Sequence, residues 1–284
     1  MTPADRVAAE EVRRRFASEA ARPDAEVDLG RAALLVGAEE EPRLADVGRC
    51  LARLDEMGEE ARARAVRWGG SKIAALNRYL FEELGFAGNE SDYYDPRNSM
   101  LHRVLGRRTG IPITLSVVYI EVGRRAGLRV EGVGLPGHFV VRAFEGEGGE
   151  GVLVDPFNRR ATDAEECQGR IDLIYDGRLE LSGEHLRAVG ARSILARMLG
   201  NLKAVYVRAG LPGRALAAVE RLLLLAPSDP DERRDRGMLL AQLGRVPEAM
   251  LELKLYLKLS PDAADAEAVR EHLKKLQSRW ASSN

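Results

Sequence analysis

The spacing of apolar positions changes twice along the chain and divides it into three zones. In the first 90 or so residues, apolar side chains recur every three or four positions, as at Leu51, Leu54 and Met57. This period predicts a layer of helices, each with one buried face. The same spacing predicts a helix over Ile73–Leu84, and Gly85 is placed to end it.

The middle zone begins with two predicted helices separated by dense turn residues. Asn98 is expected to cap a helix over 99–108, which Gly110 would end. Pro112 then stands where a first helical residue should be, and the next helix is expected to run to Gly127. Apolar side chains lie on nearly all sides of this second helix, so we expect it to be buried.

Three short strands are predicted next. They cover Arg129–Leu135, His138–Phe144 and 152–154, and the last ends at Asp155. The Gly- and Glu-rich segment 145–151 is expected to be a flexible polar turn. A helix followed by three consecutive strands favours an α+β fold with an antiparallel sheet.

The last zone repeats with a period of 34 residues. The matching pairs are Gly210 and Gly244, Ala215 and Ala249, and Pro227 and Pro261. Each unit is expected to be helix, glycine turn, helix and proline, which resembles the tetratricopeptide repeat. Two repeats and a terminal helix over Ala264–Trp280 predict an all-α region that leans on the core. We therefore expect a core domain with N-terminal helices over 1–187 and a repeat domain over 188–284.

Composition excludes several classes of function. The 284 residues include 43 Lys and Arg against 44 Asp and Glu, so no net basic field favours nucleic acid or anionic lipid. No apolar run approaches the roughly 20 residues of a membrane span. The charged first residues do not resemble a signal peptide, and two cysteines cannot form a disulfide framework. These features predict a soluble cytoplasmic protein that binds neither membrane nor nucleic acid.

No cofactor or metal is expected. The segment Gly132–Gly137 spells G-x-G-x-x-G, but a strand rather than a helix is predicted after it. A dinucleotide fingerprint needs a helix N-terminus there, so we interpret the segment as a tight turn between strands. His102, His185 and His272 have neither a second histidine at helical spacing nor a cysteine partner, which argues against a metal site.

His138 and Asp155 are the first candidate functional residues. One opens a predicted strand and the other closes the next, so antiparallel pairing would bring them together. A carboxylate beside an imidazole fixes its tautomer and supports its protonated form. Such a pair can also be structural. The run Asp92–Asn98 concentrates carboxylates and tyrosines, and it is expected either to border His138 or to be a packed connector.

The region from Gly110 to Pro156 resembles the transglutaminase-like (papain-like) core, with its buried helix, a strand opened by His138 and a strand closed by Asp155. The closest resemblance is to SirB-type bacterial proteins, carried by ALNRYLFEELGF, YYDPRNSMLHRVLGRRTGIPITLSVVY, GVGLPGHFVVR and VDPFN. That family also carries C-terminal tetratricopeptide repeats, similar to NLKAVYVRAGLPGRALAAVERLL here. The resemblance implies that His138 is the base and Asp155 the residue that orients it.

The resemblance also implies a missing nucleophile. Active members of the superfamily place a cysteine at the N-terminus of the buried helix, where the helix dipole and an imidazolium favour the thiolate. Spacing from the neighbouring glycines puts that position at Pro112. Cys50 and Cys167 do not replace it by sequence. Two hydroxyls follow Pro112 on the predicted helix. Ser116 lies one turn deeper on the same face, and Thr114 is rotated away from that face.

Three hypotheses follow. The favoured one is a non-catalytic interaction or regulatory protein whose core binds a protein or peptide, with the repeats as a second docking surface. The second is a hydrolase or acyltransferase that uses Ser116 or Thr114 with His138 and Asp155. In that case the serine is a nucleophile, whereas a structural serine would bond to a carbonyl of the preceding turn. The third is an inert scaffold.

Overall fold

The computed structural model describes residues 3–146, 149 and 151–283 of the chain. By its internal contacts the chain divides into two compact units, Met1–Met198 and Leu199–Asn284. The division falls within a helix that begins at Ala191, and a domain boundary at 187/188 stays a prediction. In the described ranges, no helix has the length and apolar character needed to cross a membrane.

The first unit opens with a helical layer, as the apolar period predicts. Its helices are α1 (Pro3–Ala20), η1 (Asp24–Glu26), α2 (Leu29–Glu40), α3 (Val47–Trp68), α4 (Lys72–Asn77), the π-helix η2 (Arg78–Glu83), η3 (Pro96–Ser99) and α5 (Leu101–Arg107). Gly85 follows the π-helical turn with φ +74°, so the expected stop is confirmed.

Two expectations for 98–110 were wrong. Asn98 lies inside η3 rather than at a helix N-cap, and its side chain is buried and bonded within the preceding loop. α5 ends at Arg107, and its C-cap Arg108 adopts the left-handed conformation. Gly110 belongs to a short parallel pair of strands, β1 (Ala87–Gly88) and β2 (Thr109–Gly110). Long-range pairing with β1 thus overrides the local glycine signal.

The core of the unit is α6 (Pro112–Arg125) and a five-stranded antiparallel sheet in the order β6-β5-β4-β3-β7. The strands are β3 (Arg129–Leu135), β4 (His138–Phe144), β5 (Val152–Asp155), β6 (Arg160–Thr162) and β7 (Ala188–Val189). The first two match their predicted bounds, and the α+β expectation is confirmed. The loop expected over 145–151 includes 147, 148 and 150, which lie outside the described residues.

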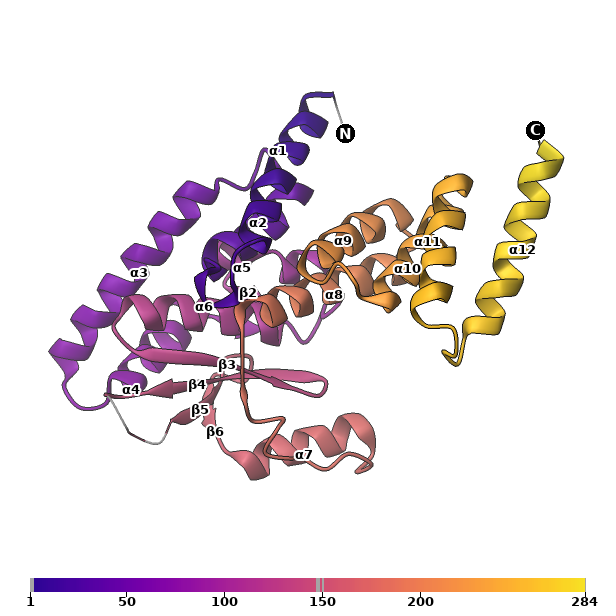
Figure 1. Ribbon diagram of the computed structural model, residues 1–284. Helices are drawn as coiled ribbons and strands as arrows, with labels where there is room; N and C mark the ends of the chain where they lie inside the picture. Colours follow the sequence, from indigo (N-terminus) through magenta and orange to yellow (C-terminus); the bar gives the residue numbers. More distant parts are fainter. Residues whose placement is uncertain (1–2, 147–148, 150, 284) are drawn as a thin grey trace. The chain divides into compact units, whose positions relative to one another are not determined.

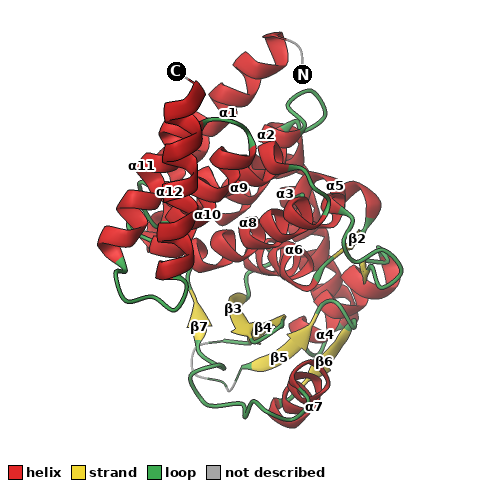
Figure 2. Ribbon diagram, turned by 90° about the vertical axis from the view of Figure 1, so that its right-hand side faces the viewer, coloured by secondary structure: helices red, strands yellow, loops and turns green. Residues whose placement is uncertain are grey.

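The sheet lies between two helices (Figures 1 and 2). α6 packs on one face, and every residue from Pro112 to Gly123 is buried, as its all-round apolar pattern predicts. α7 (Ala164–Tyr175) lies on the opposite face. There Cys167 packs into a buried apolar cluster with strand residues that include Val140 and Leu153.

The second unit consists of antiparallel helices. It contains the end of α8 (Ala191–Arg208), then α9 (Pro212–Leu225), α10 (Pro230–Gln242), α11 (Val246–Leu259) and α12 (Ala266–Ser283). Gly210 and Gly244 take positive φ in the turns, and Ala215 and Ala249 are fully buried where helices approach each other. The 34-residue period therefore produces the repeated helix pairs that it predicts.

Candidate functional site

His138 is positioned by the hairpin between β3 and β4. It is the first residue of β4 and pairs with Leu135, so the loop between them is Pro136–Gly137, with Gly137 at φ +67°. Proline followed by a glycine at positive φ is the signature of a tight turn. The G-x-G-x-x-G string is thus a strand-to-strand turn, as expected, with no helix N-terminus after it.

Asp155 meets His138 from the end of β5. Its Oδ2 lies 2.8 Å from His138 Nε2, and both side chains are buried. Oδ1 accepts from the backbone N–H groups of Phe157 (3.0 Å) and Asn158 (3.1 Å), and the Asn158 side-chain amide donates to Oδ2 at 2.6 Å. The carboxylate therefore organises the 155–158 turn as well as the imidazole.

These donors control the charge of the carboxyl group. Burial acts to raise the pKa of Asp155, but the hydrogen bond and charge of His138 and the donors of Asn158 outweigh it. The pKa of Asp155 therefore lies below its ordinary value, and the group is an anion at neutral pH.

The other imidazole nitrogen is left available. Because Nε2 faces the carboxylate, a neutral His138 carries its proton there and presents the lone pair of Nδ1. In the described part of the chain, Nδ1 has no hydrogen-bond partner. The ring of Phe157 stands edge-on to the imidazole, with centroids 6.2 Å apart. The pair is oriented as a base, and within the described residues no hydroxyl or thiol is hydrogen-bonded to it.

The start of α6 supplies no thiol. Pro112 is the first helical residue. The hydroxyl of Thr114 accepts from Ile111 N at 3.2 Å and lies 2.7 Å from the carbonyl oxygen of Asn98, to which it donates. Thr114 thus caps the helix and ties it to the preceding loop.

The Ser116 hydroxyl takes neither of the two roles predicted for it, a nucleophile beside His138 or a donor to a carbonyl of the preceding turn. Its Oγ is buried and lacks a hydrogen-bond partner among the described residues. It is therefore bonded neither to His138 nor to a carbonyl of the preceding turn, which corrects the structural expectation for this residue. The structure brings His138 and Asp155 together but joins neither Ser116 nor Thr114 to them.

Neither thiol is placed to act with His138. Burial, reinforced by Asp46, raises the pKa of Cys50 in α3. Burial also raises the pKa of Cys167, and nearby carboxylates including Asp155 add to the effect. Among described residues no hydrogen bond joins either sulfur to the imidazole. A buried neutral thiol is a poor nucleophile.

Comparison with known proteins agrees with this architecture. Residues 48–200 match the model of the transglutaminase-like superfamily, and residues 202–274 match a tetratricopeptide repeat model. A UPF0162 protein of Xylella fastidiosa is 44% identical over 213 residues, which cover 71% of this chain and 73% of the relative. The chain belongs to the UPF0162 family, within the transglutaminase-like superfamily.

Two further relatives extend the comparison. A UPF0162 protein of Pseudomonas aeruginosa is 28% identical over 249 residues, covering 87% of this chain and 90% of the relative. F-box only protein 21 of Mus musculus is 33% identical over 168 residues, which are 54% of this chain but 25% of that protein. The similarity therefore extends into a longer protein that bears a different name.

The run Asp92–Asn98 of this UPF0162 protein does two things. Asn98 and Asp95 form a packed connector, in which Asn98 bonds to Asn89 at 3.1 Å and Asp95 pairs with two arginines. Tyr93 instead reaches the ring of Phe157, with centroids 6.3 Å apart, and so borders the His138 region.

Two functional candidates near this site were missed by the sequence analysis. Arg170 of α7 stands over Phe157 and Arg197 of α8 over Phe139, each with its guanidinium carbon 5.7 Å from the ring centroid. Arginine is so frequent in this UPF0162 chain that neither residue forms a motif. Their placement follows from the fold.

Two hollows lie elsewhere in the first unit. One, of about 430 Å³, is lined by residues that include Cys50 and His102. The imidazole of His102 bonds to Glu41 at 2.8 Å, but its Nδ1 packs against Gly37 of α2 and has no partner in the described ranges, so a thiol–imidazole pair is not formed.

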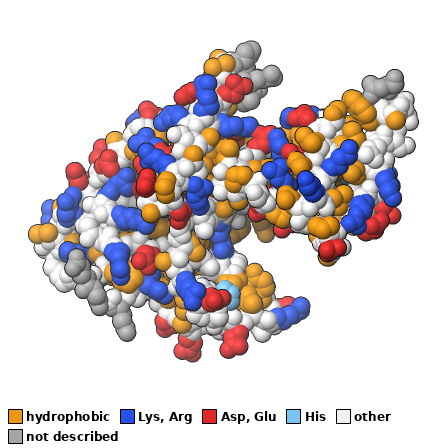
Figure 3. Space-filling model, in the orientation of Figure 1, with side chains coloured by type: hydrophobic (Ala, Val, Ile, Leu, Met, Phe, Trp, Pro, Cys, Tyr) orange, Lys and Arg blue, Asp and Glu red, His pale blue; other side chains and the backbone are white. Residues whose placement is uncertain are grey.

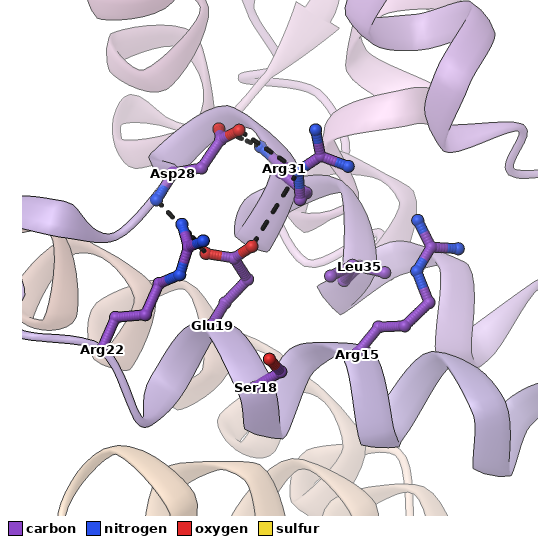
Figure 4. A pocket seen from close by; sticks show the side chains of 7 residues that line it. All are labelled: Arg15, Ser18, Glu19, Arg22, Asp28, Arg31 and Leu35. Carbon is purple, nitrogen blue, oxygen red and sulfur yellow. Dashed lines mark hydrogen bonds and ion pairs between the residues drawn. The ribbon is translucent and has the colours of Figure 1, made fainter.

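The other hollow, of about 340 Å³, lies between α1 and the start of α2 (Figure 4). Glu19 lies between Arg22 and Arg31, 3.4 Å and 3.9 Å away, and Asp28 accepts from Arg31 at 3.2 Å. Both carboxylates of this hollow are therefore paired with arginines. Across the described residues, no group of three or more His, Cys, Asp and Glu side chains is arranged to hold a metal ion.

Proposed function

We propose that this UPF0162 protein is a non-catalytic interaction or regulatory protein. Its transglutaminase-like core would bind a protein or peptide, and its repeats would form a second docking surface. The observation that carries the proposal is made at the N-terminus of α6, where Pro112 is the first helical residue. Among the residues that the structure describes, no hydroxyl or thiol is hydrogen-bonded to the imidazole of His138. We also propose that the chain is SirB-type, on the motifs that carry that resemblance.

The physical argument concerns activation of a nucleophile. A superfamily thiol reacts because a helix N-terminus and an imidazolium lower its pKa. Here the pKa of both thiols is raised, and Thr114 is used as a cap. A serine or threonine hydroxyl keeps its proton near pH 7 unless a base contacts it. Binding of a protein or peptide does not require an activated nucleophile.

The repeats support the interaction half of the proposal. A tetratricopeptide region suggests a capacity to bind proteins. Mixed charges on the visible surface favour no single-sign polymer: basic and acidic side chains alternate over the face in Figure 3. The matching region of F-box only protein 21 is a quarter of that protein, which supports a module used in more than one chain.

Activity-based labelling of the full-length protein tests the proposal. A fluorophosphonate probe and iodoacetamide are expected to leave the α6 region unmodified, with peptide mapping as the readout. His138→Gln should not change the labelling pattern. Covalent labelling of Ser116 that disappears in His138→Gln would overturn the proposal. Ser99→Ala, which alters another buried serine, is the matched control.

One observation keeps an enzymatic alternative in view. The hydroxyl of Ser116 is buried and unbonded within the described structure, so no structural hydrogen bond occupies it. The labelling experiment decides between this hydrolase or acyltransferase and the interaction protein. An inert scaffold predicts that His138→Ala leaves partner capture intact, whereas a binding core predicts its loss with folding preserved.

A further inference from the structure

A set of arginine and aromatic side chains is linked to the His138–Asp155 pair through the rings of Phe157 and Phe139. We define the arginine–aromatic group as Tyr93, Phe157, Arg170, Tyr175 and Arg197. Phe157 connects the group to His138, because its ring contacts the imidazole and also Tyr93, and Arg170 stands over it. Arg197 stands over Phe139, which follows His138 along β4, and it lies within electrostatic range of Tyr93 and Tyr175. Tyr93 and Tyr175 are each 39% exposed, so the group reaches solvent.

The two guanidinium groups of this set have no counter-ion among the described residues. In the portion of the chain that the structure describes, neither Arg170 nor Arg197 forms an ion pair or hydrogen bond with a carboxylate, and Arg170 Nε is buried without a partner. Two acidic groups of α7 have other partners: Glu166 pairs with Arg160 at 2.9 Å, and Asp172 accepts from Gln168 at 2.6 Å.

Burial makes this lack of partners costly. Desolvation lowers the pKa of Arg197, and the opposing influences are the hydroxyls of Tyr93 and Tyr175 rather than a carboxylate. Burial raises the pKa of Tyr93, and Arg197 and Arg170 both oppose that shift, so both cations lie within electrostatic range of the same phenol. A partly buried, unpaired cation is stabilised strongly by an anion that docks beside it.

We propose that the arginine–aromatic group binds a carboxylate of a peptide, held between Arg170 and Arg197 beside His138. The inference rests on the proposed function, because it names what the interaction core would take. Charge favours one carboxylate. Before the imidazole is counted, the two arginines and Asp155 sum to a net charge of +1, and a single carboxylate neutralises that excess. The exposed tyrosines offer flat apolar faces to the adjoining peptide groups.

The test uses two matched pairs of probes on the full-length protein. N-acetyl-tyrosine and N-acetyl-tyrosinamide differ in a terminal carboxylate, and N-acetyl-glutamate N-methylamide and its glutamine analogue differ in a side-chain carboxylate. Binding is followed through the imidazole NMR signals of His138, assigned with His138→Gln. A carboxylate probe should shift these signals saturably, and its amide should bind about tenfold or more weakly, as expected for loss of a charge-assisted hydrogen bond.

Variants localise the effect. Arg170→Gln and Arg197→Gln should each weaken binding of the carboxylate probe by about tenfold. Each should also reduce the ratio of the affinity for the carboxylate probe to the affinity for the amide. Arg160→Gln, which removes an arginine already paired with Glu166, should change neither. Comparison of the terminal and side-chain probes identifies which carboxylate the site takes. The wild-type probe pairs test the idea even if an arginine variant is unstable.

Three outcomes would overturn this inference: equal affinity of acid and amide, no saturable shift with either carboxylate, or tighter binding of N-acetyl-phosphotyrosinamide. These results leave the labelling test of the proposed function untouched. Conversely, His138-dependent covalent labelling with an intact carboxylate preference would reject the non-catalytic function and leave the carboxylate site standing.

Discussion

Replacement of Asp155 examines most directly what holds the His138 region together. Asp155→Ala removes the acceptor for four donors: two backbone N–H groups, the Asn158 amide and the His138 imidazole. A hydrogen bond to a charged group contributes about 1.5–3 kcal/mol, but the four share one carboxylate and are not additive. We expect Asp155→Ala to lower the unfolding free energy by about 3–5 kcal/mol, because buried donors lose their partner.

Asp155→Asn separates charge from shape. The amide oxygen can still accept the two backbone N–H groups at the Oδ1 position, but its NH₂ group then faces two other donors. The expected loss is smaller, about 1.5–3 kcal/mol. Asp163→Ala, which removes the side-chain cap of α7, is the control and should cost about 1 kcal/mol.

Urea unfolding measures both changes in a Trp280→Phe background. Trp68 then reports on the first unit alone, since Trp280 belongs to the second. The midpoint should fall while the slope with denaturant stays constant. A loss below about 1 kcal/mol for Asp155→Ala, or equal losses for Ala and Asn, would refute the proposed role of these hydrogen bonds.

The effect of these variants on the free energy of unfolding should depend on pH, in a direction set by the pKa of Asp155. The pKa of Asp155 is lowered in the folded protein, mainly by His138 and Asn158 against the effect of burial. Its stabilisation is therefore complete above the unfolded value, about pH 3.9, and is lost as pH falls through the lower folded pKa. The stability difference between wild type and Asp155→Asn should shrink as the pH falls from 5 to about 2. A difference that stays constant would contradict this.

Three further substitutions test other contacts by thermal or urea unfolding. Thr114→Val should lower the free energy of unfolding by about 1–2 kcal/mol, because α6 loses its cap. Ser116→Ala should change it by no more than about 0.5 kcal/mol, because the Ser116 hydroxyl has no described partner. Equal losses for the two variants would contradict this difference. Gly88→Ala places a Cβ 2.5 Å from the ring of Phe157 and should lower the free energy of unfolding by about 1–3 kcal/mol. The displaced ring should also shift the NMR signals of His138. Unchanged signals would argue against a coupling of Gly88 to His138 through Phe157. Glu252→Ala removes the buried partner of two arginines of α10, which lie 2.6 and 3.2 Å from its carboxylate. The second unit should lose about 2–4 kcal/mol of unfolding free energy, measured by Trp280 fluorescence. An unchanged unfolding midpoint would refute this prediction.

Local pattern and chain spacing were sufficient for several features. Strands β3 and β4 follow the predicted ranges, because a tight Pro-Gly turn fixes where β3 ends and where β4 begins. The 34-residue repeat predicts its helix pairs, because each unit contacts only its neighbours. His138 and Asp155 were expected to meet because they end adjacent antiparallel strands, and the 2.8 Å contact follows from that register.

Other features depend on partners distant in the sequence, which local pattern does not contain. Asn98 was expected to cap the helix over 99–108, but the fold buries its side chain, and its carbonyl oxygen accepts from Thr114, sixteen positions along the chain. Arg170 and Arg197 resemble every other arginine until α7 and α8 bring them to the rings beside His138. The sequence alone determined strands β3 and β4, the buried helix, the repeat and the absence of a thiol at Pro112. Tertiary packing decided which polar groups are satisfied and which stay unpaired, because hydrogen-bond partners and burial are set only when distant segments meet.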